Sequence, residues 1–155
     1  MIIRKFKQKD AQKVCNLVCR VFNKFIASDF TKQGIKKWLE EQTPKKQIER
    51  AKERDLYVAI ANNKIVGMIE GRGEENNGRV TRLFVDKNFH KKGIARNLMN
   101  KIETLYKKKK VKKIKIFSSL YAQGFYKRMG YKKTTGIIRN KKWGMIYQPM
   151  KKIFK

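Results

Sequence analysis

Residues 83–98 read LFVDKNFHKKGIARNL, and this stretch decides the fold. An apolar segment over 83–85 leads into a basic loop, then to Gly93, and then to the apolar periodicity of a helix. The first N–H groups of a helix have no intrahelical partner, and the helix dipole adds partial positive charge at the same end. A strand, a glycine turn and a helix in this order are typical of a phosphate cradle. The sequence therefore predicts a ligand that carries phosphate.

Periodicity elsewhere in the chain predicts the elements around this stretch. Helical spacing predicts helices that begin after Asp10 and after Thr31, and further helices over 45–52, 94–105 and 122–129. Asn62-Asn63 is a turn signal between two strands, and residues 74–78 are expected to form a polar loop. Alternation or short apolar runs predict strands over 2–6, 56–61, 64–70, 80–85, 112–117, 131–135 and 143–150.

This order of elements predicts the fold class. It is α/β, a single domain over residues 1–155 with a central mixed, mostly antiparallel sheet of about six to seven strands flanked by about four helices. Apolar residues make up 41% of the chain, which is enough for one packed core. No apolar run has the length of a signal peptide or a membrane span. We therefore expect a cytoplasmic protein without a membrane partner.

The cysteines and the single histidine are too few and too far apart in sequence to predict a metal site. Cys15 and Cys19 are four residues apart, so they share a helix face, and His90 is far away in sequence. A metal site needs more ligands than these. We expect two reduced, mostly buried thiols and no metal.

The net charge is +29, from 41 basic and 12 acidic residues. Such an excess attracts polyanions over a long range, so nonspecific polyanion binding is expected. The charge has two interpretations, an anionic partner or a compositional bias. Of the basic residues 31 are Lys and 10 are Arg, spread along the whole chain, and specific base recognition favours Arg. This distribution favours compositional bias without excluding a nucleic-acid partner.

Two local motifs and the order of elements resemble the GNAT N-acetyltransferase superfamily over essentially the whole chain. Residues 83–85 and the segment His90-Lys-Lys-Gly-Ile-Ala95 are similar to its acyl-CoA motif, except that His stands where Gln or Arg is usual. Residues 122–131, with Ala122, Phe125-Tyr126 and Gly130-Tyr131, are similar to its later signature. The resemblance implies an acetyl-CoA-dependent acetyltransferase of the same fold.

The resemblance also implies where acetyl-CoA binds. Strand backbone would pair with pantetheine, and loop N–H groups would hold the pyrophosphate, provided that Gly93 and Ala95 stay small. His90, Lys91, Lys92 and Arg96 would lie near the phosphates, although each could equally be an ordinary surface side chain. Ser118 and Ser119 could bind pantetheine or only start a turn. The expected acetyl-CoA residues are Leu83, Phe84, Val85, His90, Lys91, Lys92, Gly93, Ile94, Ala95, Arg96, Ser119, Phe125 and Tyr126.

Amide formation from a thioester needs a deprotonated amine, a stabilised oxyanion and a protonated leaving thiol. Tyr126 is the expected acid, with a structural aromatic as the alternative, and the Val85 N–H is the oxyanion donor that the resemblance implies. The usual Glu before the central apolar triplet is absent, because residues 79–82 read Arg-Val-Thr-Arg. Glu70 is the nearest alternative base, acting through water, unless it is solvated or paired with Arg72.

The sequence thus predicts an enzyme that transfers an acetyl group from acetyl-CoA to a primary amine by direct attack on the thioester. A small-molecule acceptor is favoured over a protein, and the positive charge argues against polyamines. The alternative is a basic module on the same fold that binds nucleic acid or the ribosome, with weak or no catalysis. The acceptor would contact residues 28–54 and the last two strands, where no motif can be read. A homodimer is the default oligomer.

Overall fold

The structure is a computed structural model that describes residues 1–155. Eight strands form one sheet. They are β1 (Ile2–Lys5), β2 (Asp55–Ala61), β3 (Lys64–Glu74), β4 (Asn77–Val85), β5 (Lys113–Ser118), β6 (Lys132–Lys133), β7 (Ile138–Asn140) and β8 (Met145–Ile153). The α-helices are α1 (Ala11–Val21), α2 (Lys32–Glu40), α3 (Pro44–Glu53), α4 (Ile94–Lys108) and α5 (Gln123–Arg128). Short helical turns cover Gln8–Asp10, Phe22–Ile26, Ala27–Asp29 and Lys87–Phe89.

The strand order is β1-β2-β3-β4-β5-β8-β6, with β7 paired to β8. Every pair is antiparallel except β4 and β5, which are joined by the crossover helix α4. The predicted α/β class and the mixed, mostly antiparallel sheet are confirmed, with slightly more strands than expected. No helix is both long enough and apolar enough to cross a membrane.

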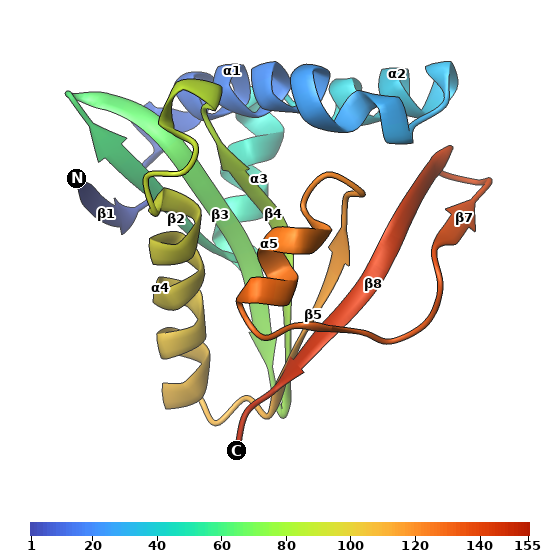
Figure 1. Ribbon diagram of the computed structural model, residues 1–155. Helices are drawn as coiled ribbons and strands as arrows, with labels where there is room; N and C mark the ends of the chain where they lie inside the picture. Colours follow the sequence, from blue (N-terminus) through green and yellow to red (C-terminus); the bar gives the residue numbers. More distant parts are fainter.

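Helices cover the sheet on both faces (Figure 1). One face packs against α4 and α5, where the larger apolar cluster includes Leu98, Ile102 and Tyr126. The other face packs against α1 to α3, where a second cluster includes Leu17 and Phe84. The apolar stripe of each helix therefore faces the sheet, which is the reason that the helical periodicity predicted α1 and α4.

The β4–β5 pair opens partway along its length. The two strands pair in parallel from Asn77 opposite Lys113 to Val80 opposite Ile116, and no pairs follow. In Figure 1 the strands run together at the lower edge of the sheet and separate upward, where α5 lies. A register shift at Glu70/Gly71 lies beside the point of separation. Residues 81–85 consequently lack a strand partner on the β5 side.

Local signals in the sequence explain several element boundaries. The Thr31 hydroxyl accepts a hydrogen bond from the Gly34 N–H at 3.0 Å and caps α2, as its residue type predicts. Asn62 and Asn63 both have positive φ and form the tight β2–β3 turn. α1 begins directly after Asp10, but the Asp10 carboxylate binds Arg4 at 2.7 Å instead of capping the helix.

Two boundaries differ from the sequence prediction. The expected polar loop over 74–78 is a tight hairpin, because β3 and β4 pair up to Glu74 opposite Asn77 around a two-residue turn. Two closing strands are expected, but the structure has three, namely β6, β7 and β8. β6 is only two residues long, and β7 forms a separate hairpin with β8. Polar and charged residues dominate both regions, so apolar periodicity carries no information there.

Candidate functional site

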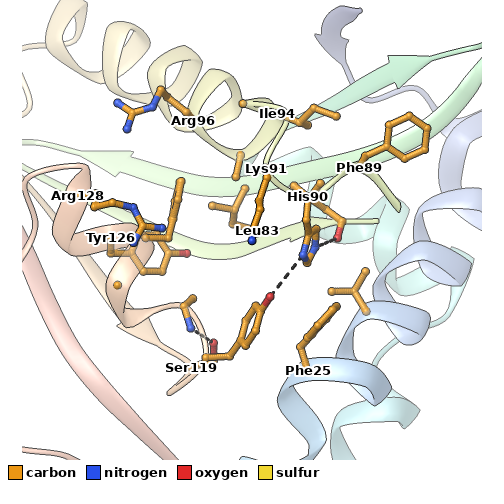
Figure 2. A pocket seen from close by; sticks show the side chains of 18 of the residues that line it. Phe25, Leu83, Phe89, His90, Lys91, Ile94, Arg96, Ser119, Tyr126 and Arg128 are labelled. Atoms are coloured by element: carbon orange, nitrogen blue, oxygen red, sulfur yellow. Dashed lines mark hydrogen bonds between the residues drawn. The ribbon is translucent and has the colours of Figure 1, made fainter. Parts of the chain in front are cut away.

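A cavity of about 520 Å³ lies in the opening between β4 and β5. Figure 2 shows its lining, which comes from the end of β4, the loop before α4, the first turn of α4, the segment from Ser119 to α5 and the end of α1. A volume of this size is in the range of small-molecule and cofactor sites. The site is therefore built where the sheet topology leaves strand edges unpaired.

The loop before α4 has the geometry of an anion cradle. Lys91 has φ +61° and Gly93 has φ +79°, so left-handed residues alternate with others along the loop. Such an alternation turns successive N–H groups to the same side. Gly93 directly precedes α4, whose first N–H groups have no intrahelical partner. Lys91 and Arg96 line the cavity beside this helix end and add positive charge.

The unpaired edge of β4 offers backbone groups to the cavity. The Asp86 N–H donates to the Val66 carbonyl on β3 at 2.8 Å. Because successive residues of a strand alternate, the N–H of Val85 points the other way, into the opening. The Val85 carbonyl accepts a hydrogen bond from His90 Nε2 at 2.8 Å, which fixes the start of the basic loop on the end of the strand.

Most of the residues predicted to bind acetyl-CoA come together in this cavity. Phe84 and Lys92 do not line it. The Phe84 side chain packs in the cluster on the opposite face of the sheet, and the Lys92 ammonium lies 5.1 Å from the Phe89 ring centroid. The predicted residues that line the cavity are Leu83, Val85, His90, Lys91, Gly93, Ile94, Ala95, Arg96, Ser119, Phe125 and Tyr126.

The structure adds lining residues that sequence reasoning missed. The chain leaves α1 through the π-helical turn Phe22–Ile26, which carries Phe25 and Ile26 to the cavity. The ring centroid of Phe25 lies 4.6 Å from the ring centroid of Tyr121 and 4.9 Å from that of His90. Arg128 of α5 also lines the cavity, on the same side as Arg96 in Figure 2. A π turn has no sequence signature, although such turns are frequent at functional sites.

A second cavity, of about 130 Å³, adjoins the first and shares Tyr126 with it. It is lined mainly by apolar and aromatic side chains, with Asp29 as its only carboxylate. Ser119 lines both cavities, and its hydroxyl accepts from the Ala122 N–H at 3.2 Å, which supports the turn-forming alternative for this serine. The residues shared by the two cavities are Ile26, Leu83, Ser119, Ala122 and Tyr126.

Tyr126 stands at the junction of the two cavities. Its ring packs edge-on against Phe125 and Tyr131, and only 6% of the residue is exposed. The hydroxyl makes no hydrogen bond with another group of the chain. Burial raises the pKa of this hydroxyl above its usual value, so it stays protonated well beyond neutral pH. The chain therefore places a protonated donor without a partner between two open spaces.

Glu70, like Lys92, is a predicted site residue that lines neither cavity. The side chain is fully buried and lies 3.0 Å from Arg54, 3.5 Å from Arg82 and 3.6 Å from Arg50. The Thr81 hydroxyl donates to the same carboxylate at 2.9 Å. The alternative that Glu70 pairs with an arginine therefore fits the geometry, although the partners are these three and not Arg72. As the counter-ion of a buried cationic cluster, Glu70 is poorly placed to accept a proton from a substrate.

The remaining sequence predictions concern cysteine and metal chemistry. Cys15 is buried, Cys19 is partly buried, and both are free thiols. Burial raises the pKa of both thiols, so they remain protonated and unreactive at neutral pH. No group of three or more His, Cys, Asp or Glu side chains is close enough together to hold a metal ion.

Comparison with known proteins agrees with this geometry. The profile of the acetyltransferase (GNAT) domain matches residues 26–154. The fold is similar to that of a PaiA N-acetyltransferase from Thermoplasma acidophilum in complex with coenzyme A, with a TM-score of 0.83, 19% identity, and coverage of 99% of this chain and 98% of that chain. No functionally curated protein matches the sequence significantly.

Two further solved structures share the fold. A GCN5-related N-acetyltransferase from Rhodopseudomonas palustris gives a TM-score of 0.84 at 15% identity, covering 99% of this chain and 95% of that chain. An aminoglycoside 6′-N-acetyltransferase complexed with coenzyme A gives a TM-score of 0.71 at 18% identity, covering 99% of this chain and 97% of that chain. The domain match, which spans most of the sequence, and the paired motifs around Gly93 and Tyr126 place this chain in the GNAT acetyltransferase family.

Proposed function

We propose that the protein transfers an acetyl group from acetyl-CoA directly to a primary amine of a small molecule. The observation that carries the proposal is the position of Tyr126, whose hydroxyl has no partner in the chain and lies where the two cavities meet. The larger cavity accommodates the acyl-CoA arm, and the smaller one admits the acceptor from the opposite side. The two substrates then meet at the opening between β4 and β5.

The larger cavity suits coenzyme A because its lining offers positive charge and free backbone hydrogen-bonding groups. The N–H groups at the start of α4 and the left-handed residues Lys91 and Gly93 form the pyrophosphate cradle. Lys91, Arg96 and Arg128 supply three cations to its lining. The free edge of β4 offers hydrogen bonds to the amides of a pantetheine chain, as an added strand would.

The site supports the following division of roles. The Val85 N–H donates to the oxygen of the thioester carbonyl as negative charge develops there. The acceptor nitrogen, after giving one proton to solvent, forms the new C–N bond while the C–S bond breaks. Tyr126 gives its proton to the departing sulfur and regains one from the nitrogen. Each turnover forms one amide and one thiol and releases one proton.

Thiol release from acetyl-CoA, measured over a panel of primary amines, amino acids and peptides, tests this function. We expect amine-dependent release and an acetylated product whose mass increases by one acetyl group. Parallel assays with longer acyl-CoA donors test the preference for acetyl-CoA. Bound acetyl-CoA without transfer to any amine would contradict the proposal.

The exchange Gly93→Asp tests the pyrophosphate cradle. A Cβ atom at Gly93 would meet no other atom within 4 Å, and Asp is among the residues that adopt the left-handed backbone most readily, so we expect the fold to persist. The new carboxylate faces the phosphates, so acetyl-CoA affinity measured by calorimetry should fall about 100-fold or more. Gly136→Asp is the matched control, because it adds the same charge at another open glycine. Equal affinities for the two variants would refute the cradle.

A second candidate function, polyanion binding, is favoured by a row of cations across the sheet. Five basic residues lie directly opposite one another on neighbouring strands, in the order Arg72, Arg79, Lys115, Lys151 and Lys132. Only Arg72 has an acidic partner, Glu74 at 3.0 Å. Like charges directly opposite one another destabilise a sheet. The row crosses five strands spaced about 4.8 Å apart, so it is about 19 Å long.

Two aromatic residues border this row and favour single-stranded nucleic acid as the polyanion. Phe117 is 48% exposed, and its ring lies 4.5 Å from that of Tyr147. The Arg79 guanidinium lies 4.8 Å from the Phe117 ring centroid. Cations that follow a phosphate backbone, next to aromatic rings on which bases stack, are the usual elements of single-strand binding.

Removing two cations of the row tests this candidate. We expect the double variant Lys115→Gln/Lys151→Gln to bind a single-stranded oligouridylate more weakly and to reduce the salt slope of log K by about 1.4, at about 0.7 for each lost phosphate contact. The control Lys36→Gln/Lys45→Gln has the same net charge and alters exposed lysines on α2 and α3. Equal losses in the two double variants would show that binding follows net charge and not this surface.

A further inference from the structure

We propose that the acceptor carries a single ammonium group on an apolar body and that Asp29 binds this ammonium. The inference rests on the proposed function and names the class of its acceptor. Two independent observations support it, namely the contacts of Asp29 and the composition of the second cavity.

The contacts of Asp29 fix one carboxylate oxygen and leave the other free. Oδ2 accepts a hydrogen bond from the Leu120 N–H at 3.0 Å, which ties the turn after α1 to the segment before α5. Oδ1 has no hydrogen-bond or ion-pair partner in the chain, and the residue lines the second cavity. The neighbouring Phe30 forms a backbone bridge with Met145 on β8, which fixes the chain directly after Asp29.

The absence of a cationic partner makes Asp29 exceptional among the acidic residues of this chain. The sequence has 41 basic residues for 12 acidic ones, and every other buried or partly buried acidic side chain is paired with a cation. The unpaired acids Glu40, Glu49, Glu53 and Glu75 are all exposed to solvent. Asp29 alone is partly buried and lacks a cation. Partial burial weakens the hydration of a carboxylate, and a cationic ligand would compensate for that loss.

The rest of the second cavity limits the acceptor to one positive charge. Seven aromatic residues are among its lining residues, and neither cavity contains another carboxylate. Arg82, the one cation of the second cavity, donates to Gln42 at 2.7 Å and lies 3.5 Å from Glu70. A second ammonium would therefore be buried against aromatic rings without a counter-ion, whereas an apolar body would be buried favourably.

Calorimetric binding of 2-phenylethylamine to the protein saturated with coenzyme A tests the proposal. This probe combines one primary ammonium with an aromatic body. We expect Asp29→Asn to raise its Kd about 10- to 100-fold. The Asn side chain can still accept from the Leu120 N–H, so the fold should persist, and Asp29→Glu should restore part of the affinity. Glu75→Gln is the matched control, since it removes one negative charge at an exposed site.

Two further probes separate charge from shape. The neutral analogue 2-phenylethanol should bind wild type and Asp29→Asn equally, and the dication 1,4-diaminobutane should bind wild type more weakly than 2-phenylethylamine. The proposal is overturned by an unchanged Kd in Asp29→Asn, by an equal loss in Glu75→Gln, by tighter binding of the diamine, or by no saturable binding of 2-phenylethylamine. Amine-dependent thiol release from acetyl-CoA would still uphold the proposed function in each of these cases.

Discussion

The variant Glu70→Gln should lower the free energy of unfolding by about 3–5 kcal/mol, the usual cost of removing one partner of a buried ion pair. For a domain of this size the melting temperature should fall by about 6–20 °C. The loss is large because single domains are stabilised by only about 5–15 kcal/mol in total. Chemical denaturation followed by tryptophan fluorescence measures it directly.

The reason lies in the charge balance around Glu70. Its fully buried carboxylate is the one negative group among Arg50, Arg54 and Arg82. Burial lowers the pKa of Arg82 to about 10 against the opposing effect of Glu70, so this guanidinium stays charged at neutral pH. A neutral glutamine would leave three cations close together without a counter-ion. Repulsion between them would then oppose folding.

Glu74→Gln is the matched control on the same strand. Glu74 also pairs with an arginine, at 3.0 Å, but both side chains are more than half exposed, so its loss should cost less than about 1 kcal/mol. Turnover by folded Glu70→Gln should remain close to that of wild type. A collapse of turnover with unchanged stability would instead identify Glu70 as the proton acceptor that the sequence suggested.

The elements around Gly93 could be predicted because their signals are local. A strand, a basic loop and an amphipathic helix are consecutive in sequence, and the phosphate cradle uses the backbone N–H groups of that same segment. The capping threonine of α2 and the Asn62-Asn63 turn are equally local, since each contact spans three residues or fewer. Such features depend on residue type and spacing alone.

The roles of Glu70 and Asp29 could not be predicted because they depend on contacts between distant segments. Arg54 is 16 residues from Glu70 in sequence, and Leu120 is 91 residues from Asp29. Alternation places Glu70 on the face of β3 that carries Met68, but nothing in the spacing shows that three arginines from other segments meet it there. Asp29 follows a π-helical turn, so the 3.6-residue spacing of α1 does not predict which way the Asp29 side chain points.

Tyr126→Phe should lower kcat by about 10²- to 10⁴-fold, the usual contribution of a positioned general acid, and should change the KM for acetyl-CoA little. The phenylalanine ring keeps the packing against Phe125 and Tyr131. The lost hydroxyl has no partner in the chain, so no buried group is left unpaired and the melting temperature should hold. Steady-state kinetics on the best acceptor of the amine panel gives the comparison.

The pH dependence of wild-type activity is a second test of Tyr126 as the acid. The acid is active while protonated, so activity is lost only as the pH rises through the pKa of Tyr126. Burial raises that pKa above its usual value of about 10, so no Tyr126-dependent alkaline decline should appear below about pH 10. An alkaline decline centred well below pH 10 that Tyr126→Phe removes would contradict this assignment of the pKa.

Tyr131→Phe is the control that separates chemistry from packing. The Tyr131 hydroxyl donates to buried Glu103 at 2.9 Å, so its loss should cost about 1–3 kcal/mol of stability. Its ring stays in place against Tyr126, so turnover should stay near that of wild type. The two neighbouring tyrosines therefore make opposite predictions, one for turnover alone and one for stability alone. If both variants lose stability and neither loses turnover, Tyr126 is a structural aromatic and another group protonates the thiolate.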